Sequence, residues 1–158
     1  MREDLTDKVA LVTGSARRVG RVIAVELAKA GANVMVHYHN SDESDVRDTL
    51  HEIKSEGVDA FSVQADVSQP DGIKILFDAI REHFGKLDIL VNSASVFHRN
   101  ALMDVSFDHW NQSIAVNLTA PFLCTQAAVT LMRENDPKGG AIVNICDYGA
   151  VRAWKGYG

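Results

Sequence analysis

The sequence predicts an α/β fold in which a doubly wound parallel sheet lies between two layers of helices. Short runs rich in β-branched residues recur along the chain, longer stretches with helical spacing separate them, and the two kinds alternate throughout. Alternating strands and helices form βαβ units, whose helices cover both faces of a parallel sheet. With 158 residues, of which 46% are hydrophobic, the chain can form one core. We therefore expect a single three-layer α/β/α domain over residues 1–158.

Five segments have the length and composition of buried parallel strands. Each is a short, mainly apolar run, such as Lys-Val-Ala-Leu-Val-Thr for the first, and is flanked by polar or turn-forming residues. The predicted strands span residues 8–13, 33–38, 59–64, 87–91 and 140–145.

Four segments between these strands have the apolar spacing of helices. The first should end at Gly31, because glycine readily adopts the left-handed conformation that often terminates a helix. The last is long and contains Pro121, which we expect to bend the helix without ending it. The predicted helices span residues 18–30, 43–55, 71–84 and 107–134.

Composition argues against several classes of function. The net charge is −5 with both signs mixed along the chain, which gives no basic face for nucleic acid or an anionic membrane. No apolar run reaches the roughly 18 residues that span a bilayer, and the first residues do not resemble a secretory signal. Cys124 and Cys146 lie in apolar stretches without metal-ligand spacing, so we expect both to be reduced and buried. The predicted protein is soluble and cytoplasmic and holds no metal.

A glycine-bearing turn between the first strand and the first helix predicts a phosphate site. Glycine lets the backbone approach a pyrophosphate, and the start of the helix supplies free N–H groups and a positive dipole end. Arg18 would add positive charge there, although it could also be a solvated arginine in the first helical turn. Glycines that serve only the geometry of the loop are the alternative for the whole turn. The turn reads Thr13-Gly14-Ser15-Ala16-Arg17-Arg18-Val19-Gly20.

The end of the second strand favours NADP(H) over NAD(H). Dinucleotide folds that prefer NAD carry an acidic residue about 20 positions beyond the glycines. From Gly20 that count falls near His39, and no carboxylate comes before Asp42. A ribose 2′-phosphate can accept hydrogen bonds there, and a helix-capping role of the Asn and Ser is compatible with this interpretation. The candidate donors are His39, Asn40, Ser41 and Arg18.

The chain resembles the short-chain dehydrogenase/reductase family over nearly its whole length. The phosphate turn is similar to the family's Thr-Gly-x-x-x-Gly-x-Gly, with Arg18 in place of the middle glycine. Asn92-Ser-Ala-Ser stands where the family has Asn-Asn-Ala-Gly, and Asn117 matches a structural and proton-relay asparagine. The resemblance implies a Rossmann-type fold. It also implies cofactor contacts from Gly14, Arg17, Arg18, Val19, Gly20, Asp66, Val67, Asn92, Ala94 and Ser95, in addition to the residues after the second strand.

Four departures from the general family pattern resemble its pteridine reductase branch. They are Arg18, the His-Tyr-His-Asn-Ser after the second strand, a motif ending at Phe97, and Asp147 in place of a catalytic serine. The resemblance implies that Phe97 stacks on a pterin and that Arg18 and Ser95 contact the ring and the cofactor. Asp147 would hold or relay a proton. The alternatives are a Phe97 in the core and an Asp147 that closes a turn before Gly149.

The family's Tyr-x-x-x-Lys motif, which donates the proton, is not found in these 158 residues. The resemblance places its tyrosine near position 160, so Tyr157 is not assigned a catalytic role. Relatives have roughly 250 residues, and we expect this sequence to be the N-terminal part of a longer single-domain reductase. The faces of the fourth and fifth strands should then be uncovered.

The leading hypothesis is an NADPH-dependent reductase that acts on a pteridine, such as a dihydropterin or dihydrofolate. One alternative is a general carbonyl or 3-oxoacyl reductase in which Asp147 merely replaces the serine. Another is a non-catalytic NADP-binding protein. By resemblance, the protein should form a homotetramer through its long helices.

Overall fold

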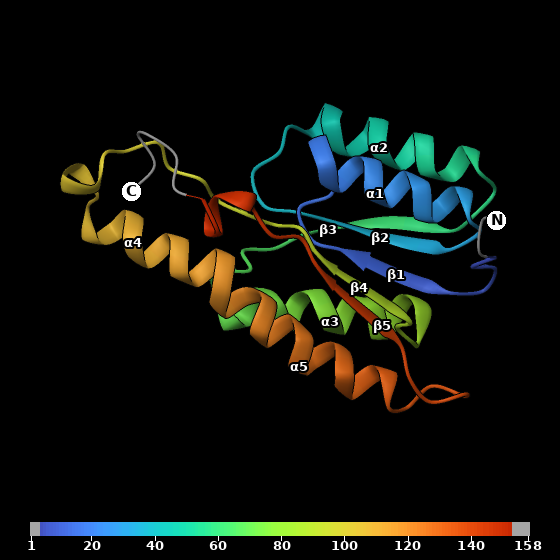
Figure 1. The fold of residues 1–158 in the computed structure, drawn as a ribbon. Helices are drawn as coiled ribbons and strands as arrows, with labels where there is room; N and C mark the ends of the chain where they lie inside the picture. The colour runs from blue at the N-terminus through green and yellow to red at the C-terminus, as the bar shows by residue number, and fades with distance from the viewer. Residues whose placement is uncertain (1–3, 153–158) are drawn as a thin grey trace.

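Five parallel strands form one sheet in the computed structural model, which describes residues 4–152. Their order in the sheet is β3-β2-β1-β4-β5 (Figure 1). The chain proceeds from β1 to one edge and then returns to the other side of β1, which is the arrangement of a doubly wound sheet. The predicted fold class is confirmed. The strands are β1 (Val9–Val12), β2 (Asn33–Tyr38), β3 (Ala60–Gln64), β4 (Ile89–Asn92) and β5 (Ala141–Asn144).

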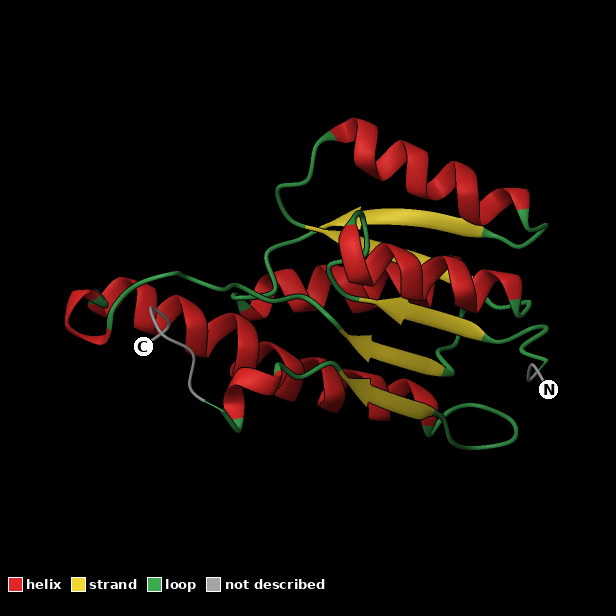
Figure 2. Cartoon of the chain, turned by 45° about the horizontal axis from the view of Figure 1, so that its top comes forward, coloured by secondary structure: helices red, strands yellow, loops and turns green. Residues whose placement is uncertain are grey.

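Helices cover both faces of the sheet. Helices α1 (Arg18–Lys29) and α2 (Glu43–Ser55) lie on one face, and α3 (Pro70–Phe84) and α5 (Ala120–Met132) lie on the other (Figures 1 and 2). The remaining helical segments are η1 (Leu102–Asp104), α4 (Phe107–Ile114), η2 (Ala115–Thr119) and η3 (Tyr148–Ala150). The predicted strands and helices are all present, and their ends lie within two residues of the predicted ones.

The last predicted helix, residues 107–134, consists of three segments. Helix α4 passes into the π-helical turn η2, and α5 follows and ends at Met132. Pro121 lies in the first turn of α5. It has no N–H to donate to the carbonyl of Asn117 four residues earlier, where a regular α-helix would need that bond. The prediction of a long helix that continues past Pro121 is confirmed. It did not foresee the wider π-type winding that precedes the proline.

The combined helix Phe107–Met132 is apolar. Its best 18-residue window has a mean hydropathy of 1.5, so by length and composition this helix is able to cross a membrane. The prediction that no segment reaches this length is wrong. Yet α5 contacts α3 and β4 and buries Ala120, Cys124 and Ala128 in the core. In this fold the helix covers the sheet.

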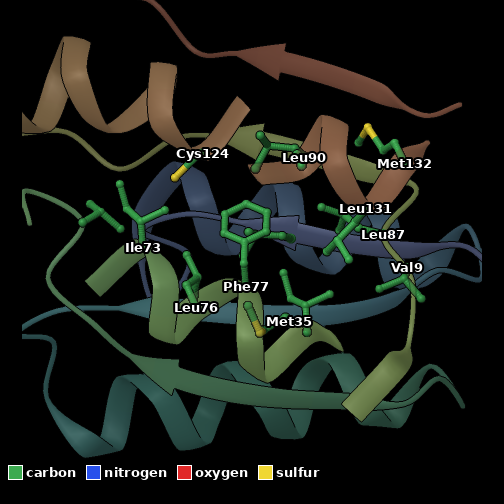
Figure 3. Close-up of a cluster of buried hydrophobic side chains, with 14 of the residues drawn as sticks. Val9, Met35, Ile73, Leu76, Phe77, Leu87, Leu90, Cys124, Leu131 and Met132 are labelled. Atoms are coloured by element: carbon green, nitrogen blue, oxygen red, sulfur yellow. The ribbon is translucent and has the colours of Figure 1, made fainter. Parts of the chain in front are cut away.

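Two hydrophobic cores hold the layers together. The core beneath α3 and α5 has Phe77 at its centre, with Leu76 and Leu90 beside it and Cys124 above (Figure 3). The second core lies beneath α1 and α2 and is built mainly from valine and alanine. Strand β4 contributes to both cores, so the prediction that its faces are uncovered is wrong. Strand β5, at the sheet edge, is mostly exposed as predicted.

Replacing Leu76 by alanine tests the core beneath α3. Leu76 is fully buried, whereas the neighbouring Ile75 is 54% exposed on the same helix. We expect Leu76→Ala to lower the free energy of unfolding by about 3 kcal/mol, because it leaves a cavity. The matched control Ile75→Ala should cost about 0.5 kcal/mol. Urea denaturation measures both, and equal losses would contradict this assignment of the core.

Candidate functional site

A cleft of about 360 Å³ opens at the carboxyl ends of β1, β2 and β4. Open α/β sheets bind their ligands at this edge, where the strand order reverses. Every predicted cofactor residue lines the cleft except Asn92. The lining residues are Gly14, Arg17, Arg18, Val19, Gly20, His37, Tyr38, His39, Asn40, Ser41, Asp66, Val67, Ser68, Ser93, Ala94, Ser95, Val96, Gln112 and Val116.

The turn after β1 approaches its surroundings too closely for side chains at two positions. A Cβ on Gly14 would lie 2.8 Å from the Cα of Ala94, and Gly14 has a φ of +67°. A Cβ on Gly20 would lie 2.3 Å from the carbonyl oxygen of Gly14. Both positions therefore require glycine, and the open backbone of the turn lies against the cleft. This geometry fits a bound phosphate group.

Arg18 has a backbone conformation that glycine would adopt more easily. Its φ is +54°, in the left-handed region, and it is the residue that stands in place of the family's middle glycine. A non-glycine residue in this region costs about 1 kcal/mol. Arg17 and Arg18 both line the cleft. The strained position thus adds positive charge to a wall that would face a phosphate.

His37, which has no predicted role in the sequence, lines the cleft and contacts the phosphate turn. The backbone N–H of Gly14 donates to its Nδ1 at 3.0 Å, and its Nε2 lies 3.1 Å from the carbonyl oxygen of Ala65. The side chain is 1% exposed. Burial lowers the pKa of His37 to about 4, with the nearby His39 lowering it further and the contact with Ala65 and the charge of Asp66 opposing the shift. The ring is therefore neutral at physiological pH.

Four other hydrogen bonds hold the phosphate turn in place. The hydroxyl of Ser15 donates to Val12 O at 2.6 Å, and the hydroxyl of Thr49 on α2 donates to Ala16 O at 2.8 Å. On the other side, the Thr13 hydroxyl oxygen accepts bonds from the N–H groups of Ser93 and Ala94, at 2.9 and 3.0 Å. The turn is thereby joined to α2 and to the loop after β4.

His39 and Asp66 lie next to each other in the cleft, just after the adjacent strands β2 and β3. The His39 Nδ1 is 3.8 Å from Asp66 Oδ1. Partial burial raises the pKa of Asp66, but hydrogen bonds from Ser68 and the charges of His39 and His37 outweigh it, so the pKa lies below its usual value. Asp66 is thus ionised at neutral pH.

Two predicted asparagines have structural contacts. The Asn92 amide donates to Asn144 Oδ1 at 2.8 Å and joins the ends of β4 and β5. In the π turn, Asn117 Oδ1 accepts a bond from Val96 N and its Nδ2 donates to Val96 O, both at 2.9 Å. Asn117 therefore holds the loop that forms one wall of the cleft, and its role in proton relay stays a prediction.

The structure separates the predicted substrate residues into two groups. Arg18 and Ser95 line the cleft, but Phe97 and Asp147 are absent from its lining. Phe97 is 64% exposed, which rules out a place in the core. The Asp147 carboxylate accepts a hydrogen bond from the N–H of Gly149. Asp147 therefore closes a turn, which is the structural role given above as the alternative to proton transfer. Tyr157 lies outside the described residues.

Residues after Phe97 form a polar cluster beside the cleft. The rings of His98 and His109 stack with centroids 4.2 Å apart. His98 Nε2 donates to Gln112 Oε1 at 2.9 Å, and the Asn100 amide donates to His109 Nδ1 at 2.8 Å. Since Gln112 lines the cleft, this cluster fixes one of its walls.

The two cysteines have different environments. Cys124 is buried, and burial raises its pKa to about 12. Cys146 is exposed, so its predicted burial is wrong; it follows the mostly exposed edge strand β5. Within residues 4–152, no group of three or more His, Cys, Asp and Glu side chains is arranged to hold a metal ion.

The lowered pKa of His37 predicts a pH-dependent stability. The unfolded chain binds a proton at this residue below about pH 6.5, whereas the folded protein resists protonation until about pH 4. The contribution is therefore complete above pH 6.5 and is lost as pH falls toward 4. Between pH 7 and pH 5 we expect His37 to account for a loss of roughly 2 kcal/mol.

Urea denaturation of the unsubstituted protein and of His37→Asn at several pH values measures this loss. Because His37→Asn removes the titrating ring, its stability should fall less over the same interval. Identical pH profiles for the two proteins would contradict the assignment.

The chain matches the short chain dehydrogenase family over residues 8–157. It is 43% identical over 146 residues to glucose 1-dehydrogenase 2 of Bacillus subtilis, covering 92% of this chain and 56% of the relative. It is 41% identical over 138 residues to a 3-oxoacyl-(acyl-carrier-protein) reductase FabG of Staphylococcus aureus, covering 87% and 55%.

Among solved structures, a short chain dehydrogenase from Burkholderia cenocepacia in complex with NADP superposes with a TM-score of 0.87 at 32% identity. The match covers 98% of this chain and 61% of that structure. The chain thus spans a little over half the length of these relatives. The order of its strands, the glycine turn and the match over residues 8–157 show that the chain belongs to the short-chain dehydrogenase family.

Proposed function

We propose that this protein is an NADP(H)-dependent oxidoreductase that acts on a small molecule. The main support for this proposal is the set of residues after β2: His39, Asn40 and Ser41 line the same cleft as Arg18. A 2′-phosphate can accept hydrogen bonds from these groups, and the guanidinium charge favours it. The NADP bound by the Burkholderia structure supports the same assignment.

The described residues fit the parts of this cofactor. Gly14 and Gly20 leave the backbone of the turn open to a pyrophosphate, and α1 directs its positive end toward it. Asp66 and Val67, to which the family resemblance also assigns cofactor contacts, line the cleft after β3. The bound cofactor supplies a hydride, while the protein orients the substrate and excludes water.

For the substrate we propose a pteridine. Arg18 and Ser95 line the cleft, and the exposed ring of Phe97 directly follows Val96, another lining residue. An aromatic ring that stacks on a flat heterocycle contributes about 0.5–1.5 kcal/mol beyond burial. Asp147 follows β5 and is exposed, so a substrate can reach its carboxylate, which we propose relays a proton to a ring nitrogen.

A general carbonyl or 3-oxoacyl reductase is the second candidate. It is favoured by the turn that Asp147 closes with Gly149. This structural contact accounts for an aspartate at position 147 even if the residue does not contact a substrate. The names of the Bacillus and Staphylococcus relatives also favour it.

We further propose a soluble, cytoplasmic homotetramer assembled through α4 and α5. Large apolar side chains recur along the exposed side of these helices at the spacing of one helical face. An apolar surface of this kind is typical of an interface between subunits. The exposed residues are Phe107, Trp110, Ile114, Leu118, Phe122 and Val129.

Replacing Arg18 tests the cofactor assignment. We expect NADPH to bind at least about tenfold more tightly than NADH, and Arg18→Ala and Arg18→Gly to weaken NADPH binding about tenfold by removing a charge-assisted contact. Arg18→Gly should also melt at a higher temperature than Arg18→Ala, since glycine relieves the left-handed φ. Fluorescence titration and thermal melts measure these effects. Arg47→Ala, at an exposed arginine on α2, is the control, and equal affinity for both cofactors would refute the NADP(H) proposal.

A substrate panel distinguishes the candidate reactions in the full-length protein. We expect NADPH oxidation with dihydrobiopterin or dihydrofolate, and a kcat/KM about tenfold lower in Phe97→Ala, in which the stacking surface is lost. Asp147→Ala should lower kcat for the pterin. Met103→Ala, which removes an exposed apolar side chain outside both the cleft lining and the proposed interface, is the control. Turnover of a simple ketone alone would establish the second candidate, and NADPH binding without turnover of any substrate would indicate a non-catalytic binder.

A further inference from the structure

His37 joins three segments at the cleft. Its backbone belongs to β2, its Nδ1 accepts from the N–H of Gly14 at 3.0 Å, and its Nε2 lies 3.1 Å from Ala65 O beyond β3. An N–H group can only donate and a carbonyl oxygen can only accept. The two contacts therefore require the neutral tautomer with hydrogen on Nε2.

The same residue holds a second N–H of the phosphate turn. Ser15 N donates to the backbone carbonyl of His37 at 2.9 Å. The N–H groups of Gly14 and Ser15 are thus both directed toward His37. A ligand in the cleft is left with the N–H groups at the start of α1, where the first turn has no intrahelical partners.

We propose that His37 is a positioning residue for cofactor binding, because its ring sets the conformation of the turn that receives the pyrophosphate. The inference rests on the proposed NADP(H) binding and adds to it a residue whose side chain is buried and contacts the turn from beneath. It acts through Gly14, whose position is also fixed by the close approach to Ala94.

The neutral ring is suited to this position. Neutral imidazole offers one acceptor and one donor, whereas the cation offers two donors and would oppose the N–H of Gly14. Burial keeps the pKa of His37 at about 4. The titratable groups around it are His39 just after β2 and Asp66 after β3, and Arg17 and Arg18 line the same cleft.

Three substitutions separate the two ring contacts. Asn at this position can place its oxygen where Nδ1 lies and accept from Gly14. Gln can place its amide near Nε2 and reach Ala65, but it leaves the Gly14 N–H without that acceptor. Leu removes both contacts. The series is His37→Asn, His37→Gln and His37→Leu, with His37 in the full-length protein as reference and the exposed α2 residue in His51→Gln as control.

Isothermal titration with NADP⁺ and with adenosine 2′-monophosphate measures the effect. We expect His37→Gln and His37→Leu to raise the Kd for NADP⁺ about tenfold, and His37→Asn to stay within about threefold of the reference. Adenosine 2′-monophosphate lacks the pyrophosphate, so its Kd should not change. If His37→Leu does not fold, the comparison of His37→Gln with His37→Asn still tests whether the contact with Gly14 supports cofactor binding.

Two results would overturn the role of His37: equal Kd values for NADP⁺ in all variants, or the same loss of affinity for both ligands. Failure of the unsubstituted protein to bind NADP⁺ would instead refute the proposed function.

Long-range ¹H–¹⁵N spectra of the His37 ring provide a second test that needs no ligand. We expect the neutral Nε2–H tautomer from pH 8 to pH 5, and a charged ring at pH 6 or an Nδ1–H tautomer would overturn the inference.

Discussion

The close approach of the β1 turn to the loop after β4 is the constraint on which the candidate site depends. Gly14 lies so near Ala94 that a side chain would displace one of the two loops, and the Thr13 hydroxyl joins them by two hydrogen bonds. The walls of the cleft are therefore set by packing and hydrogen bonds within the protein. A site that is organised in this way needs little rearrangement to receive a ligand.

The same constraint explains the distribution of polar contacts around the cleft. Thr49 reaches the turn from α2, and Asn117 holds the loop at Val96 from the π turn. Each of these side chains pairs with backbone groups of the turn or of the loop and so holds that segment in place. Polar residues at the sheet edge thus serve the shape of the cleft as well as its chemistry.

The fold and the cofactor side of the cleft could be predicted from the sequence, because both follow from local patterns. Alternating apolar runs specify the strands and helices, and Gly14 and Gly20 lie in a turn with a recognisable spacing. The role of His37 depends on contacts with residues 23 and 28 positions away, which no local pattern reveals. A signal was present, since His37 is a polar residue in an otherwise apolar part of β2. The π turn likewise depends on how α4 and α5 continue each other, and the exposure of Cys146 depends on the position of β5 at the edge.

Because the two thiols differ in accessibility, the rates at which they are chemically labelled can report local opening of the protein. The reactive form of cysteine is the thiolate, so a thiol reagent has access to Cys146 in the native state. It reaches Cys124 only when α5 separates from the sheet, because this thiol is 1% exposed and has a pKa of about 12. The rate at which Cys124 is labelled therefore reports how often the core beneath α5 opens, a local event that can occur without global unfolding.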